Sequence, residues 1–106
     1  MAPDDEFESF KTEYRNSLPQ KMRDIDGARA ALEDGAADVQ RLRDLLRMVH
    51  SIAGSARTFG VEGLSEAAAA AEAYIEPWCE RGALPAAPER AELVRLLAAV
   101  RAAAGC

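Results

Sequence analysis

The chain contains one histidine, and the residues around it suit chemistry on an exposed imidazole. His50 lies in a segment whose apolar residues recur at helical spacing. At about 100° per residue it falls at the edge of that apolar stripe, facing water. Gly54 follows one helical turn later, where glycine costs roughly 0.5 to 1 kcal/mol relative to alanine. We interpret this glycine as room for another molecule to approach the backbone beside His50.

Positively charged side chains share the histidine's face of this segment. Arg43 and Arg57 fall within about 40° of His50, and Arg47 lies at roughly 60°. In a chain with a formal net charge of −5, they create a local positive surface suited to a phosphoryl group or an acidic partner. Three other interpretations stay open: His50 is a buried structural residue, Gly54 permits tight helix packing, or the arginines form a solvated face.

Other kinds of chemical site find little support in the sequence. A lone histidine with no carboxylate cluster or cysteine at ligand spacing does not indicate a metal site. The glycines near His50 lack the strand, lysine and Ser/Thr of a phosphate-binding loop. Ser51 and Ser55 turn away from His50 by about 100° and 140°, which argues against a Ser/His nucleophilic pair.

The composition favours helices as the elements that position these residues. The 106 residues, 49% hydrophobic and 29% charged, predict a single domain over residues 1–106. Alanine and leucine are abundant while β-branched residues are few, which favours helix over sheet. Because the acidic charge is spread along the chain, nucleic acid and anionic membranes are not expected as partners.

Cysteine usage and hydropathy indicate where the protein works. Cys79 and Cys106 show neither a metal-ligand spacing nor a disulfide pattern, which fits a reducing compartment. The acidic N-terminal run does not resemble a signal peptide, and no apolar run approaches the length of a membrane span. We therefore expect a cytoplasmic protein.

Apolar stripes at helical spacing predict four main helices. The first stripe spans residues 7–32, and Pro19 interrupts it. We therefore expect one kinked helix, or a short helix abutting a longer one. Asp4 and Asp5 suit its start, and Gly35 is a plausible end.

The second stripe spans residues 39–59 and is expected to end at Gly60. The third stripe spans residues 64–78, where Pro77 is expected to kink or end the regular helix and Gly82 to close the segment.

A linker rich in glycine and proline leads to the last helix, with Pro88 as its first residue and a stripe over residues 93–104. Trp78 and the phenylalanines are expected to fill the core. Four helices joined by short loops imply an all-α fold, an antiparallel four-helix bundle with a short or kinked N-terminal segment.

The run HSIAGSARTFG, followed by Leu64, resembles the signature of histidine-containing phosphotransfer (HPt) domains. It is especially similar to the N-terminal phosphotransfer domain of chemotaxis-type histidine kinases. His50 matches the phosphoacceptor, Gly54 the small residue that lets a receiver domain approach, and Gly60 the glycine that ends the helix. Ala53 departs from the pattern, because the family usually has a lysine there that helps neutralise the phosphoryl group.

The resemblance also assigns an orienting residue. In chemotaxis-type domains a glutamate 22 residues after the histidine accepts a hydrogen bond from its Nδ1, and Glu72 occupies that position. Glu72 lies at the edge of its own stripe, as His50 does, so antiparallel packing would bring the two edges together. The carboxylate would leave Nε2 free and more basic; the other interpretation is an exposed surface glutamate. We infer that Arg57 supplies the positive charge missing at Ala53.

The resemblance implies a phosphocarrier rather than an ATP-using enzyme. His50 would accept a phosphoryl group at Nε2 from a kinase or an aspartyl phosphate, then pass it to an aspartate of a response-regulator receiver. The expected partners are that receiver and a histidine kinase, the expected state is a monomer, and no cofactor is expected on this chain because Mg²⁺ would come with the receiver. Besides His50, Glu72 and Arg57, the residues expected at the partner surface are Gly54, Arg47, Arg43 and Ala53. The alternative is a helical interaction module that does not carry phosphate, which the missing lysine favours.

Overall fold

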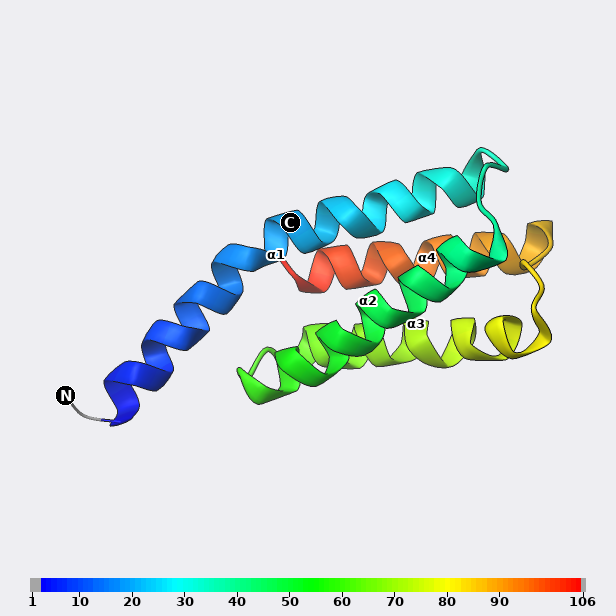
Figure 1. The fold of residues 1–106 in the computed structure, drawn as a ribbon. Helices are drawn as coiled ribbons and strands as arrows, with labels where there is room; N and C mark the ends of the chain where they lie inside the picture. Colours follow the sequence, from blue (N-terminus) through cyan, green and yellow to red (C-terminus); the bar gives the residue numbers. More distant parts are fainter. Residues whose placement is uncertain (1–2, 106) are drawn as a thin grey trace.

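The computed structural model describes residues 3–105, the first three by their backbone only, as four helices joined by short loops (Figure 1). The helices are α1 (Pro3–Glu33), α2 (Val39–Thr58), α3 (Glu62–Arg81) and α4 (Ala87–Ala103). Successive helices run antiparallel, and each packs against the next, with α1 also against α4. The predicted all-α bundle is confirmed. Within residues 3–105, none of the helices is both long and apolar enough to cross a membrane.

Local sequence sets both ends of α2, the helix that carries the histidine. The side chain of Asp38 accepts a hydrogen bond from the Arg41 backbone N–H at 2.8 Å, which satisfies a donor left free at the helix start. At the other end, Gly60 has a φ of +76°, a left-handed conformation that glycine adopts most easily. The Val61 N–H then reaches back to the Ala56 carbonyl at 2.8 Å. These contacts turn the chain directly into α3.

The other predicted helix boundaries mostly hold. Gly35 and Gly82 follow α1 and α3 with φ values of +74° and +65°, as the sequence predicts. Pro88 lies in the first turn of α4, one residue later than expected. However, α3 continues past Pro77 to Arg81, so of the two expected effects, a kink or an end, the end is wrong. Because Pro77 is exposed, water can satisfy the carbonyl that it leaves without a partner.

Pro19 lies inside α1, which remains a single helix. Proline has no backbone N–H, so one hydrogen bond of the helix is lost at this point. Figure 1 shows α1 changing direction near its middle: the second half lies along α4, and the first half runs outward from the bundle. Of the two predicted alternatives, the kinked helix is the one observed. The side chains of Asp4 and Asp5 lie outside the described residues, as does Cys106.

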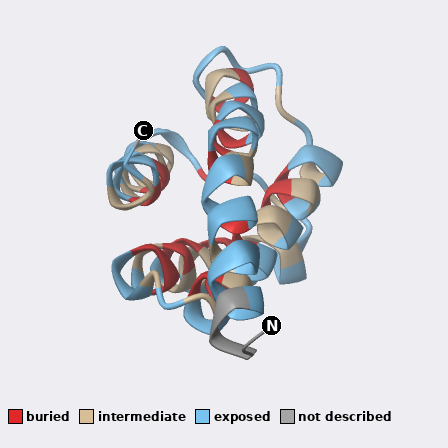
Figure 2. Cartoon of the chain, turned by 90° about the vertical axis from the view of Figure 1, so that its left-hand side faces the viewer, coloured by how far each residue is buried: buried red, intermediate tan, exposed pale blue. Residues whose placement is uncertain are grey.

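The hydrophobic core fills the space between the four helices, and Figure 2 shows the buried residues facing this interior. The most extensive packing is between α2 and α3. The largest fully buried side chains come from all four helices: Ile25, Leu42, Leu45, Val49, Ile52, Leu64, Ile75, Leu93, Leu97 and Val100.

Two of the three phenylalanines lie outside this core, which corrects the prediction. Phe7 and Phe10 are 44% and 55% exposed, whereas Phe59 is half-buried against Tyr14, with ring centroids 5.0 Å apart. Trp78 is also partly buried against the core. The cause is helix length: α1 has 31 residues and α2 has 20, so α1 is longer by roughly 16 Å at about 1.5 Å per residue. Its first turns extend past most of the bundle, although Phe7 still stacks on Phe59 at the end of α2, with ring centroids 6.1 Å apart.

The location of the core can be tested with two substitutions that both truncate a large apolar side chain. Leu45→Ala should lower the free energy of unfolding by about 2–5 kcal/mol, because it leaves a cavity in a fully buried site. Phe10→Ala should change it by about 0.5 kcal/mol or less, since that side chain is mostly exposed. Denaturant titration followed by circular dichroism measures both. A large loss with Phe10→Ala would contradict this placement of α1.

Candidate functional site

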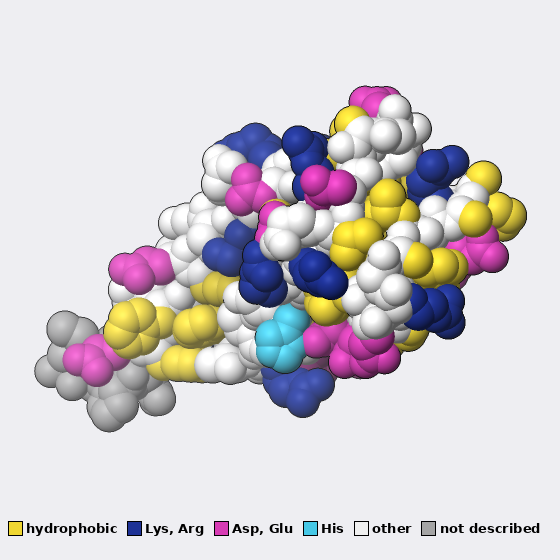
Figure 3. Space-filling model, turned by 45° about the vertical axis from the view of Figure 1, so that its right-hand side comes forward, with side chains coloured by type: hydrophobic (Ala, Val, Ile, Leu, Met, Phe, Trp, Pro, Cys, Tyr) yellow, Lys and Arg dark blue, Asp and Glu magenta, His cyan; other side chains and the backbone are white. Residues whose placement is uncertain are grey.

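His50 lies on the exposed ridge of α2 and contacts a carboxylate of α3. Its side chain is 74% exposed, and its Nδ1 is hydrogen-bonded to Oε2 of Glu72, which is 25% exposed. The interpretation of His50 as a buried structural histidine is therefore wrong. Figure 3 shows the histidine at the surface with acidic and basic side chains beside it. The two stripe edges predicted to meet do lie together.

The contact between His50 and Glu72 depends on how closely α3 is held to α2. Ser65 is buried, and its hydroxyl donates to the Ala53 carbonyl at 2.7 Å, which links the two helices beside the histidine. The sequence argument missed Ser65. The available signal was its place directly after Leu64 on the apolar stripe, where a polar side chain needs a buried partner.

The carboxylate determines the hydrogen position on the imidazole ring. An ionised carboxylate only accepts hydrogen bonds, so Nδ1 of His50 must donate to Glu72. In the neutral ring, Nε2 then keeps its lone pair and is available as a nucleophile on the exposed side. This arrangement can attack an electrophile delivered by a partner.

A shallow, open depression surrounds the histidine. Its lining comes from α2 and α3: His50, Ala53, Gly54, Arg57, Ala69 and Glu72. Gly54 is exposed, and a Cβ built on it would meet no atom within 4 Å. Helix packing therefore does not explain this glycine, and the surface beside His50 is open to a partner.

The three arginines on the histidine's face of α2, Arg43, Arg47 and Arg57, lie in different surroundings, and of these only Arg57 lines the depression. Arg47 is ion-paired with Asp44 on its own helix. Burial raises the pKa of the Cys79 thiol of α3, and the positive charge of Arg43 opposes that rise. Arg43 thus acts on the charge of a group near the end of α3, and it does not line the histidine's depression.

Helix geometry gives a reason for this difference. Side chains of an α-helix lean toward its N-terminus, so Arg57, two turns after His50, leans back toward the imidazole. By the same rule Arg43 and Arg47, which precede His50, lean away from it. The three positive charges are therefore not equivalent, although they share one helix face.

The other positions singled out in the sequence contribute no reactive group. Ala53 of α2 is buried where this helix meets α3. It lines the depression but carries no charge. Ser55 donates its hydroxyl to Tyr14 of α1 at 2.9 Å, on the side of α2 away from His50. Among residues 3–105, no group of three or more His, Cys, Asp and Glu is placed to hold a metal ion.

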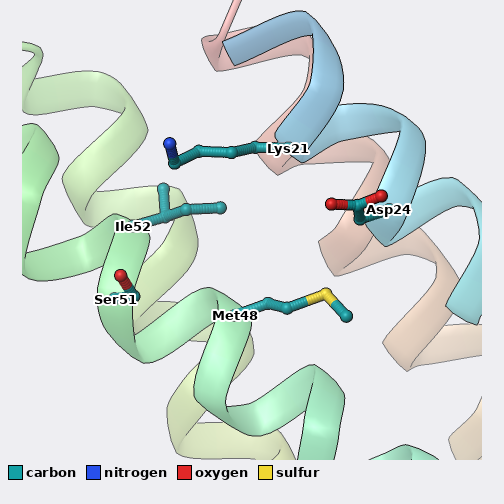
Figure 4. Close-up of a pocket in the computed structure, with 5 residues that line it drawn as sticks. All are labelled: Lys21, Asp24, Met48, Ser51 and Ile52. Carbon is teal, nitrogen blue, oxygen red and sulfur yellow. The ribbon is translucent and has the colours of Figure 1, made fainter. Parts of the chain in front are cut away.

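A hollow with an apolar floor lies between α1 and α2, and it is separate from the histidine's depression. Met48 and Ile52 of α2 form its apolar floor, and Lys21, Asp24 and Ser51 stand around it (Figure 4). Lys21 is held there by a hydrogen bond from its Nζ to a neighbouring serine of α1. None of the predicted site residues lines this hollow.

Comparison with known proteins gives one match. A family model described as Hpt domain matches residues 9–103, which include almost all of the four helices and both His50 and Glu72. No curated protein and no solved structure shows a significant match to the chain.

Two glycines near the site should respond in opposite ways to alanine. Gly54→Ala should raise the free energy of unfolding by about 0.5–1 kcal/mol, because alanine is the better helix former and nothing obstructs its methyl group. Gly60→Ala should lower it by about 1–2 kcal/mol, since the φ of +76° strains any residue with a Cβ. Thermal unfolding of the two variants measures the difference. Destabilisation by Gly54→Ala would mean that its surroundings are packed.

Proposed function

The chain belongs to the Hpt domain family of histidine phosphocarriers in two-component phosphorelays, and we propose that His50 is its phosphoacceptor, reacting at Nε2. His50 is the only histidine in the sequence. The observation that carries the proposal is the hydrogen bond between its Nδ1 and Glu72, on a ring that is otherwise exposed. A histidine held in this way presents its second nitrogen to a partner.

The transfer proceeds in two displacements on phosphorus. The Nε2 lone pair of His50 forms a bond to phosphorus while the bond from phosphorus to the donor oxygen breaks, and the donor keeps that electron pair. Nδ1 retains its hydrogen, so the phosphorylated ring gains positive charge. In the second step an aspartate oxygen of the receiver attacks phosphorus, and the N–P bond breaks to restore the lone pair on Nε2.

We assign Glu72 the role of orienting His50. Its carboxylate fixes the ring by accepting from Nδ1, and its negative charge opposes the positive charge that the ring gains on phosphorylation. Both effects favour attack by Nε2. Neither requires Glu72 to exchange a proton.

We assign Arg57 the role that a lysine has in the family pattern. Ala53, at the lysine position, offers no charge, while Arg57 lines the same depression and leans toward His50. A guanidinium can hold two phosphoryl oxygens at once. Arg57 would therefore offset the negative charge of the phosphoryl group from the rim of the depression.

The partner supplies the remaining parts of the reaction. Kinases and receiver domains are the partners of this family, and the open surface at Gly54 fits the approach of a receiver to His50. A glutamine or leucine at position 54 would stand in that approach. We expect Mg²⁺, which balances phosphoryl charge in such transfers, to arrive in the receiver's acidic pocket. The monomeric state and cytoplasmic localisation stay predictions from the sequence.

His50→Gln tests the phosphoacceptor directly. The variant should keep the helical fold, because His50 contributes no core volume, and it should lose phosphate uptake completely. Circular dichroism checks the fold, and incubation with a phosphorylated receiver or a histidine kinase checks uptake as acid-labile, base-stable phosphate. Uptake by the variant at the wild-type rate would show that another residue is the acceptor. Receiver binding without uptake by the wild-type protein would instead support the interaction-module alternative.

Arg57→Ala and Arg43→Ala remove the same charge from the same helix and form a matched pair. Arg57→Ala should slow transfer by about ten- to a hundredfold, since a hydrogen bond to a charged group is worth about 1.5–3 kcal/mol. Arg43→Ala should have a much smaller effect, because Arg43 does not line the depression and leans away from His50. The Arg57 contribution should persist in high salt, whereas long-range attraction is screened. Equal effects that both vanish in high salt would show that the arginines only attract the partner.

A further inference from the structure

Arg57 lines two depressions, neither of which is the hollow between α1 and α2. On one side it lines the depression around His50 and Glu72. On the other it lines a second depression together with Glu62, Ser65 and Glu66 at the start of α3. Within residues 3–105, Arg57 forms no ion pair, so its guanidinium is not committed to either side.

The direction of the side chains places the guanidinium between the two groups of anions. Arg57 leans toward the N-terminus of α2, which is the direction of His50. Because α3 is antiparallel, Glu62 and Glu66 lean the opposite way, toward the turn at Gly60. The two glutamates are four residues apart and therefore adjacent on one face of α3. Arg57 thus has a carboxylate pair on one side and the reacting histidine on the other.

The spacing of these groups is fixed by a buried contact. Ser65 lies between Glu62 and Glu66 in the lining of the second depression, and its hydroxyl is bonded to the Ala53 carbonyl. This bond holds the first turns of α3 against α2 at the level of Arg57. The guanidinium can therefore change partners by side-chain rotation, with both helices in place.

We propose that Glu62 and Glu66 compete with the phosphoryl group for Arg57, and so set how firmly the domain holds phosphate. This inference rests on the proposed roles of His50 and Arg57. When His50 is free, the carboxylate pair attracts the guanidinium. A phosphoryl group, with close to two negative charges at neutral pH, attracts it to the other side. The net stabilisation of phosphohistidine is the difference between these two interactions, which keeps the phosphoryl group transferable.

The experiment compares two double variants that each remove two negative charges from α3. Glu62→Gln/Glu66→Gln removes the competing pair. The control is Glu76→Gln/Glu80→Gln, a pair that lies on the other side of Glu72 and whose glutamates are likewise four residues apart. Each protein is phosphorylated with phosphoramidate, in which Nε2 displaces ammonia from phosphorus. Phosphorus NMR then follows the rate of loading and the half-life of phosphohistidine, and circular dichroism checks the fold.

The variant without the competing pair should load faster and hold phosphate about two- to fivefold longer than the control, the range that exposed ion pairs give. Glu62→Asp/Glu66→Asp, which keeps both charges, should restore the wild-type half-life. In an Arg57→Ala background the difference between the two double variants should vanish. Equal half-lives for the two double variants, or a difference that survives Arg57→Ala, would overturn the inference. Failure of the wild-type protein to form phosphohistidine would instead count against the proposed function.

Discussion

The packing of α2 against α3 is the constraint on which the site depends. His50 and Glu72 lie on different helices, so their contact exists only at one register of the two. That register is set at the turn, where Gly60 reverses the chain, and again at the buried bond from Ser65 to the Ala53 carbonyl. A slip by one residue would rotate each side chain about 100° around its helix and separate the imidazole from the carboxylate.

This packing lets stability and reactivity occupy different faces of α2. The buried side of the helix, with Leu45 and Val49, holds the bundle together, while His50 and Gly54 lie on the exposed side. The stability gained from core packing therefore offsets the low helix propensity of a glycine inside the helix. A reactive surface on such a support can be reshaped without loss of the fold, because its residues contribute no core volume.

Helical periodicity in the sequence predicts which face of a helix a residue lies on. It does not predict which groups of a neighbouring helix lie opposite that residue. His50 and Glu72 could be found because each lies at the edge of a stripe, and two antiparallel stripes bring their edges together. Phe10 lies on a stripe as well, but periodicity shows only which face it is on, and does not show that this side chain stays 55% exposed. Ser65 escaped notice for the related reason that its partner, the Ala53 carbonyl, is a backbone group on another helix.

The role proposed for Arg57, in place of a lysine at position 53, would change more than the identity of the cation. Position 53 is buried where α2 meets α3, so a charge there would be confined to the histidine's depression. Arg57 lies in the last turn of α2, where a positive charge also interacts favourably with the helix dipole. From this rim it lines both the depression around the histidine and the depression at the acidic start of α3. In this proposal, a charge one turn later than position 53 is subject to residues that a lysine at position 53 would not meet.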